Sequence, residues 1–358
     1  MRWILTIMLL CSLLILPTSA RAAPPFSSIP PSSVITRTPN QWTTTYSNIY
    51  TPGSDWSKYG PTFDETNVFQ ARISHNEPEK NWELRIGRGS QVYSIRVNNK
   101  EYIGNQVPKG EWNDRVMQTE ILDRSQNTSE HPYFIHQSGT YAFDGLSLPF
   151  YSPILDESWN QTTKTYNVTV WPQQAHIPTP HRSYVIFEEI IRDVGDGVVE
   201  VTYLYHNFGG DLIDYFSTPW VALDGPTVPI SYYAALDGSI IQSTRMWPTT
   251  PSVFLKDLGG WVSFVEGATS ESKGMALVSG KDKYWNYPFV RVPTTTLFGY
   301  SEPPHQLQIL TNSNSLHHLN GAASYFYRFY LVFGTRDHIH SVANELVNHV
   351  ENGPIVFT

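Results

Sequence analysis

The sequence predicts an all-β protein, a large antiparallel sandwich of two sheets with one C-terminal helix. From about residue 80 onward, short apolar segments rich in β-branched and aromatic residues follow one another, separated by turns of Gly, Asn, Asp and Pro. Neither βαβ alternation nor an internal repeat is evident. Helical spacing of apolar residues is sustained only from His338 to Val350.

The first 22 residues have the pattern of a secretory signal peptide. Arg2 supplies an early positive charge, an apolar run extends from Trp3 to Leu16, and small residues stand at Ala20 and Ala22. The run is shorter than the roughly 20 residues of a membrane-spanning helix. We therefore expect cleavage after Ala22 and a mature chain that is secreted, or periplasmic in a bacterium, without a membrane attachment.

Composition narrows the class of protein further. The one cysteine, Cys11, lies in the segment to be removed, so the mature chain has no disulfide or thiol chemistry and needs a large core. Lys and Arg number 24 against 32 Asp and Glu, a net charge of −8, or −10 once Arg2 and Arg21 are removed. Without a basic block, nucleic acid is not an expected partner. The 14% aromatic content suits sugar stacking as well as strand packing.

Along the chain, residues 23–63 form a leader rich in Pro, Ser and Thr, and residues 64–358 form a single β domain. The domain opens with a β-meander over residues 82–103, with a corner at Gly87-Arg88-Gly89. That corner leads into a strand rather than a helix, so it is not a phosphate-binding loop.

The segment from His131 to His136 holds two imidazoles and a phenol. We interpret it as a polar loop, with a metal site as the alternative. Asn127, Asn160 and Asn167 begin Asn-x-Ser/Thr sequences and are N-glycosylation candidates if the source is a eukaryote.

The middle of the chain contains its clearest strands. A strand from Arg182 to Arg192 ends in a Gly-Asp-Gly turn and places Glu188 and Glu189 on opposite faces. Residues 198–225 alternate with period 2 on both sides of Asn207-Phe-Gly-Gly-Asp, which predicts a half-buried hairpin.

Further strands continue to the C-terminus. They are expected at residues 230–235, 239–245, 261–266, 274–279, 287–292 and 305–310. An aromatic strand from Ala323 to Phe333 should be central to a sheet, and residues 334–337 should cap the helix that follows.

Two stretches resemble the galactose mutarotase-like superfamily, whose fold is a β-supersandwich. They are WELRIGRGSQVYSIRVNNKEYI at residues 82–103 and VVEVTYLYHNFGGDLIDYFSTPWVAL at residues 198–223. The resemblance covers about residues 80–335 and implies an activity on carbohydrate, since polysaccharide lyases and several glycoside hydrolases share the fold. Where aldose epimerases of that superfamily have a His-Pro-Tyr-Phe-Asn-like motif, this chain has Phe216-Ser-Thr-Pro-Trp220. The resemblance therefore does not imply simple mutarotation.

A lyase acting on a uronate glycan is the favoured function. It needs a cation to neutralise the uronate carboxylate and a His or Tyr to take the C5 proton. The cation candidates are Arg88, Lys283 and Arg291. The proton acceptors are His136, His206, Tyr215 and Tyr300. Trp220, Trp285 and Tyr300 offer rings to a sugar.

Two alternatives stay open. A glycoside hydrolase would need facing carboxylates, for which Glu188, Asp214 and Asp224 are candidates. A non-catalytic glycan-binding protein would need only the aromatic loops. In each case the partner is a poly- or oligosaccharide and no cofactor is expected, while a divalent cation and the oligomeric state stay open.

If the protein is an enzyme, at least three candidates should converge on one groove. The candidates to which this prediction applies are His131, His136, His206, Glu188, Asp214, Tyr215 and Arg291.

Overall fold

The computed structural model describes residues 69–354 apart from 77, 79, 104–116, 129–130, 137, 144–145, 153, 175–184, 208–212, 225–226, 244–252, 255–257, 280–287, 292–305, 312–323 and 351. The chain divides into two units, residues 1–30 and 31–358, and every described residue belongs to the second. The predicted signal peptide and leader lie outside the described residues. No helix in the described part has the length and apolar character needed to cross a membrane.

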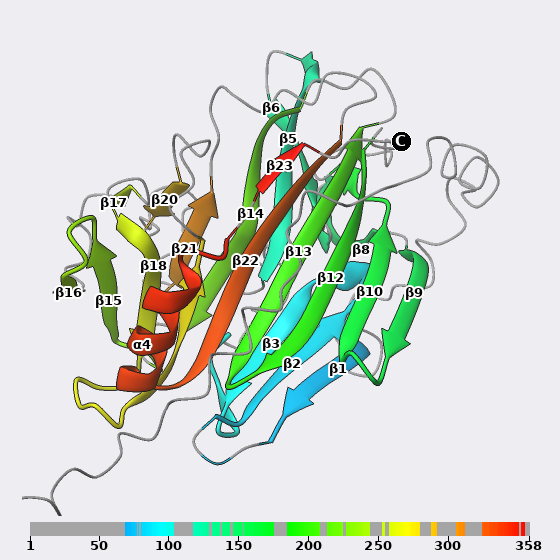
Figure 1. Ribbon diagram of the computed structural model, residues 1–358. Coiled ribbons are helices and arrows are strands. Elements are labelled where there is room, and N and C mark those ends of the chain that lie inside the picture. Colours follow the sequence, from blue (N-terminus) through cyan, green and yellow to red (C-terminus); the bar gives the residue numbers. More distant parts are fainter. Residues whose placement is uncertain are drawn as a thin grey trace, which may run out of the picture. The chain divides into compact units, whose positions relative to one another are not determined.

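The second unit is an antiparallel sandwich of two large sheets, as the sequence predicts (Figure 1). The eleven-stranded sheet follows the order β1-β2-β3-β5-β14-β21-β20-β17, with β4 on β3, β6 on β5 and β11 on β6. Its strands are β1 (Phe69–His75), β2 (Trp82–Gly87), β3 (Val92–Val97), β4 (Lys100–Glu101), β5 (Met117–Thr128), β6 (His131–His136), β11 (Gln173–Gln174), β14 (Ile213–Asp224), β17 (Val253–Phe254), β20 (Pro288–Arg291) and β21 (Gln306–Thr311).

The ten-stranded sheet follows the order β16-β15-β18-β19-β22-β13-β12-β10-β9, with β23 on β22. Its strands are β9 (Ile154–Asn160), β10 (Thr165–Val170), β12 (Val185–Gly195), β13 (Val198–Asn207), β15 (Ile230–Ala235), β16 (Ile240–Ser243), β18 (Leu258–Val265), β19 (Lys273–Val278), β22 (Ser324–Thr335) and β23 (Asn352–Pro354). A separate pair joins β7 (Ser138–Phe143) to β8 (Leu146–Tyr151).

Aromatic side chains fill the space between the two sheets. Trp82 of β2 stacks on Phe333 of β22, with ring centroids 5.6 Å apart. Tyr203 of β13 lies 5.7 Å from Phe187 and 6.2 Å from Phe329, centroid to centroid. All of these side chains are fully buried. This aromatic core gives a disulfide-free β domain its stabilising apolar area.

The hairpin predicted over residues 198–225 is wrong in its pairing. Both strands exist, but β13 pairs with β12 and β22, whereas β14 pairs with β5 and β21 in the other sheet. Because β12 and β22 occupy both edges of β13, no edge is left for β14. Period-2 alternation reports which face a residue occupies and not which strand lies beside it.

The half-buried character predicted for β13 is also wrong, because all ten of its residues are buried. Val199, Val201, Tyr203 and Tyr205 belong to the core cluster, and the alternate residues lie on the outer face, turned away from the eleven-stranded sheet.

The Gly-Asp-Gly turn closes the hairpin that does form, between β12 and β13. Gly195, Asp196 and Gly197 all have positive φ, at 89°, 55° and 75°. A Cβ at Gly197 would collide with the carbonyl oxygen of Phe333, so close packing as well as φ requires glycine there.

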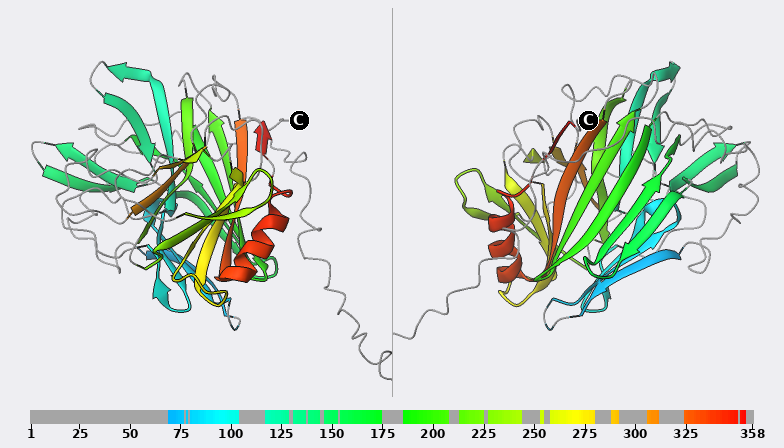
Figure 2. Two further views of the ribbon diagram at one scale, coloured as in Figure 1. Left: turned by 90° about the vertical axis from the view of Figure 1, so that its left-hand side faces the viewer. Right: turned by 45° about the vertical axis from the view of Figure 1, so that its right-hand side comes forward.

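The helix α4 (Arg336–Leu346) packs on β18, β19 and β22 on the outer face of the ten-stranded sheet (Figure 2). It begins two residues earlier and ends four residues earlier than the periodicity predicts, with Thr335 as its N-cap. In the described part it is the one α-helix, and its buried residues include Ile339, Val342 and Leu346.

Other elements agree with the sequence, with one exception. The meander β2-β3-β4 is confirmed, with the three-residue 3₁₀ turn η4 (Arg88–Ser90) at the predicted corner. The segment His131–His136, expected to be a loop, is strand β6. It lies between β5 and β11, and pairing with two neighbours outweighs its polar composition.

Candidate functional site

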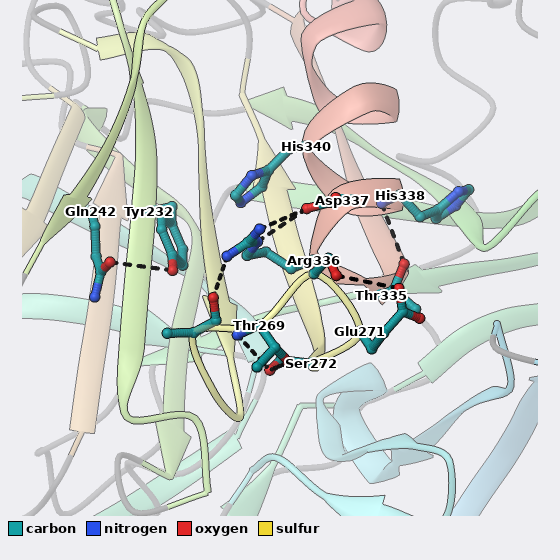
Figure 3. Close-up of polar contacts among 12 residues, drawn as sticks. Tyr232, Gln242, Thr269, Glu271, Ser272, Thr335, Arg336, Asp337, His338 and His340 are labelled. Atoms are coloured by element: carbon teal, nitrogen blue, oxygen red, sulfur yellow. Dashed lines mark hydrogen bonds and ion pairs between the residues drawn. The ribbon is translucent and has the colours of Figure 1, made fainter.

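An open pocket of about 500 Å³ lies where α4 meets the edge of the ten-stranded sheet. Its lining residues come from β15, β16 and the first turns of the helix, and they are Tyr232, Ile240, Arg336, Asp337 and His340. Figure 3 shows Arg336 between Tyr232 and the helix. We refer to this site as the α4 pocket.

The guanidinium of Arg336 is held on three sides. Its Nη1 donates to the carbonyl oxygen of Ala268 in the β18–β19 loop. Its Nε and Nη2 donate to one oxygen of Asp337, Oδ1, at 3.1 and 2.9 Å. Its Cζ lies 5.6 Å from the centroid of the Tyr232 ring, within cation–π range. The hydrogen bond to Asp337 raises the pKa of Arg336, so the pocket contains a permanent, oriented cation.

The backbone N–H groups at the start of α4 already have acceptors within the protein. Arg336 N donates to Ser272 O at 2.8 Å, and Asp337 N donates to Ser270 O at 3.4 Å. The Thr335 hydroxyl accepts from His338 N at 3.4 Å. Because these donors are satisfied, an anion entering the pocket would be bound by the Arg336 side chain rather than by the helix terminus.

His340 forms the floor of the pocket. Its ring lies 5.0 Å from Tyr232 and 5.1 Å from Trp261, centroid to centroid, and its Nε2 is 3.0 Å from the Ser263 hydroxyl. Burial, with a smaller contribution from the Arg336 cation, lowers the pKa of His340 to about 4. The imidazole is therefore neutral at pH 7. Ser263 is fully buried, so this serine–histidine pair cannot present a nucleophile to a substrate.

The rim of the pocket is apolar on the sheet side. Ile240 lines the pocket there and is 42% exposed. Gln242 accepts a hydrogen bond from the Tyr232 hydroxyl at 3.4 Å beside this rim. The pocket thus combines an apolar wall with an oriented cation.

A second group of polar residues lies farther along the outer face of the same sheet. His206 Nε2 is 3.9 Å from Glu188 Oε1, and both side chains are largely buried. Six residues before His206 on the same strand, Glu200 accepts from Arg192 at 2.9 Å and lies 3.7 Å from Arg328 Nε. We call Glu188 and His206 the outer-face pair.

A third cluster is sealed between the sheets. Glu189 is fully buried and accepts hydrogen bonds from the Tyr203 hydroxyl, at 2.7 Å, and from the Ser90 hydroxyl. Burial, followed by the negative charge of Glu189, raises the pKa of Tyr203 well above its ordinary value, so this phenol remains a donor. Ser90 belongs to η4, the turn between β2 and β3 of the eleven-stranded sheet, so Glu189 links the two layers.

Of the residues predicted to form the site, the structure brings Glu188 and His206 together, and it describes the side chains of no others. The backbones of His136, Asp214, Tyr215, Trp220, Asp224 and Arg291 lie in β6, β14 and β20 of the eleven-stranded sheet, and that of Arg88 lies in η4. Lys283, Trp285 and Tyr300 lie outside the described residues. The predicted convergence of three candidates stays a prediction.

The residues of the α4 pocket were missed at the level of the sequence. From the sequence, Arg336 and Asp337 were predicted only to cap a helix, and Tyr232 and Ile240 only to lie in strands. The available signal was an Arg-Asp pair in the first helical turn directly after a buried strand. Among the described residues, no group of three or more His, Cys, Asp or Glu is placed to hold a metal ion.

No family model matches the chain, and no curated protein matches it. Among solved structures, the α-galactosidase from Lactobacillus brevis aligns with a TM-score of 0.40 and 8% identity, over 74% of this chain and 39% of its own. The GH36 α-galactosidase AgaB from Geobacillus stearothermophilus aligns with a TM-score of 0.42 and 8% identity, over 76% and 41%. The galactosidase domain of the α-galactosidase–sucrose kinase AgaSK gives 0.41 and 8%, over 76% and 41%. This chain thus spans about two fifths of the length of these proteins.

Proposed function

We propose that this protein is a secreted carbohydrate-binding protein that holds part of a poly- or oligosaccharide in the α4 pocket. The observation that carries the proposal is that the oriented guanidinium of Arg336 and the exposed apolar side chain of Ile240 line the same pocket. A sugar ring has an apolar C–H face and a rim of oxygens. The apolar C–H face can pack on Ile240, and the guanidinium of Arg336 can donate hydrogen bonds to the sugar oxygens.

Export through a signal peptide cut after Ala22, and membership of the galactose mutarotase-like superfamily, belong to the same proposal. A thiol-free mature chain and a two-sheet sandwich of this size are compatible with both. Nucleic acid is not proposed as a partner, because the mature chain is acidic and has no basic block.

Cleavage of a uronate glycan by β-elimination is the catalytic form of the proposal. The acid–base candidate for it is the outer-face pair, an imidazole beside a carboxylate. His206 pairs with Ser324 at the start of β22, whereas α4 follows the end of that strand, so the pair would act on a polymer long enough to reach both places. His340 is less suited to the role, since a base with a pKa of about 4 is weak at neutral pH.

Binding is tested by isothermal titration of the mature chain, residues 23–358, with a set of neutral and uronate oligosaccharides. We expect Arg336→Gln to weaken binding at least about tenfold, the loss of a charge-assisted hydrogen bond. Arg72→Gln is the matched control, because Arg72 is 58% exposed on the other sheet. Absence of binding to any oligosaccharide, or equal binding by the wild type and R336Q, contradicts the proposal.

Catalysis is tested by incubating the same protein with uronate polymers. New ultraviolet absorbance from the unsaturated product indicates a lyase, and new reducing ends without it indicate a hydrolase. Retention on the polymer with neither signal identifies a binding protein. His206→Gln should abolish elimination and leave titrated affinity unchanged if the outer-face pair carries the chemistry.

A further inference from the structure

We propose that Asp337 is a specificity-determining residue that occupies the anion-binding edge of Arg336 and is displaced by a carboxylate of the ligand. This inference rests on the proposed function of the α4 pocket and names the class of ligand, an acidic saccharide. It also assigns Asp337 a role as an internal competitor.

The contacts of Arg336 divide its guanidinium into a fixed side and an exchangeable side. The fixed side is Nη1, which is bound to the Ala268 carbonyl oxygen of the β18–β19 loop. The exchangeable side is the edge formed by Nε and Nη2, which donates to the side chain of Asp337. Removal of Asp337 from this edge would leave Arg336 held by Ala268 and Tyr232.

The geometry at that edge is incomplete. Both hydrogen bonds end on a single oxygen, Oδ1 of Asp337. A carboxylate that approaches from the pocket can place one oxygen on Nε and the other on Nη2, which is the stronger fork-to-fork arrangement. The incoming group therefore gains better hydrogen-bond geometry than the one that it replaces.

Displacement should be easy, because the Asp337 side chain is 63% exposed. An exposed carboxylate keeps its hydration when it rotates away, and exposed ion pairs contribute little to stability. Thr335 and the β18–β19 loop hold the start of α4 independently of the Asp337 side chain. The helix should therefore survive the exchange.

The test compares a uronate oligosaccharide with its methyl ester, a pair that differs only in the carboxylate. Titration of Asp337→Asn and Asp337→Ala should show affinity for the uronate raised about five- to tenfold, with affinity for the ester unchanged within twofold. Arg336→Gln should abolish the preference for the uronate. Circular dichroism and thermal unfolding of each variant check that α4 remains folded.

Glu271→Gln separates displacement from a general charge effect. Glu271 is an exposed carboxylate in the same β18–β19 loop, where it accepts a hydrogen bond from the Ser270 hydroxyl at 3.3 Å. If E271Q raises uronate affinity as much as D337N does, the effect is long-range charge and the inference is wrong. If D337N weakens binding of both saccharides, Asp337 is a sugar contact and the inference is wrong, although the proposed function stands. If neither saccharide binds the wild type or any variant, the proposed function fails as well.

Discussion

The Glu189 cluster and the α4 pocket place the same kinds of groups, a carboxylate and a tyrosine hydroxyl, on the two sides of one sheet. In the interior, Glu189 is fully buried and its oxygens accept from Tyr203 and Ser90. In the pocket, Asp337 is 63% exposed, and a single oxygen of its carboxylate accepts two hydrogen bonds from Arg336. The sealed carboxylate is saturated by fixed donors, whereas the exposed one can exchange its partner for a ligand.

The interior cluster should therefore contribute to the stability of the fold, and the pocket to the binding of a ligand. A buried acceptor that loses its donors bears the full desolvation penalty, so the interior cluster should tolerate little change. An exposed ion pair is screened by water, so the pocket can change partners without unfolding the sheet. The predictions below test this contrast, beginning with the largest expected effect.

Glu189→Ala should destabilise the protein by about 3–5 kcal/mol, because it leaves the Tyr203 and Ser90 hydroxyls without their acceptor and opens a void. Urea unfolding measures the change. Glu189→Gln retains one acceptor oxygen, so it should lower the free energy of unfolding by less than Glu189→Ala does. Glu271→Ala, at an exposed site, should lie within about 0.5 kcal/mol of the wild type. An E189A protein as stable as E271A would show that the interior cluster has no such role.

His340 should make the pocket end of the sheet acid-sensitive. Its pKa in the folded protein is about 4, below the ordinary value of 6.5, so below pH 6.5 the unfolded chain binds the proton more readily. Stability attributable to His340 is complete above pH 6.5 and falls as the pH drops toward 4. We expect a loss of about 2 kcal/mol, allowing for water that reaches the ring through the pocket.

Urea unfolding at several pH values between 4 and 7 measures this loss. His340→Gln should flatten the dependence in that window. An identical slope for the wild type and H340Q would assign the acid sensitivity to other groups.

Thr335→Ala should destabilise the protein by about 1 kcal/mol, because the His338 N–H loses its capping acceptor. Thr335→Ser retains the hydroxyl and serves as the control. As Arg336 follows directly, T335A should also weaken saccharide binding in the same titration. Full affinity in T335A would mean that the β18–β19 loop alone positions Arg336.

Arg72→Ala should change stability by less than about 0.5 kcal/mol. Arg72 is 58% exposed and lies 3.7 Å from Glu83, which already has Arg85 at 2.7 Å. Thermal unfolding is sufficient to measure this small shift. A loss above 1 kcal/mol would show that surface ion pairs of this domain are stronger than exposed pairs usually are.

The candidate site was less predictable than the fold, because sequence spacing places residues on faces but does not pair distant elements. Glu188 and His206 were candidates on separate strands, and the β12–β13 register places them together. Tyr232 and Arg336 are 104 positions apart, and they meet only because α4 folds back over β18 and β19. No local pattern encodes that contact.

The sequence by itself determined the all-β class, most strand positions, the Gly-Asp-Gly turn and the terminal helix, since these depend on side-chain periodicity and local backbone preference. Only the tertiary structure decided that β13 and β14 belong to different sheets and that Glu189 faces inward while Glu188 faces outward. It also decided that the start of α4 closes a pocket. Strand pairing and helix docking depend on contacts between residues far apart in the chain, and such contacts leave no periodic trace in the sequence.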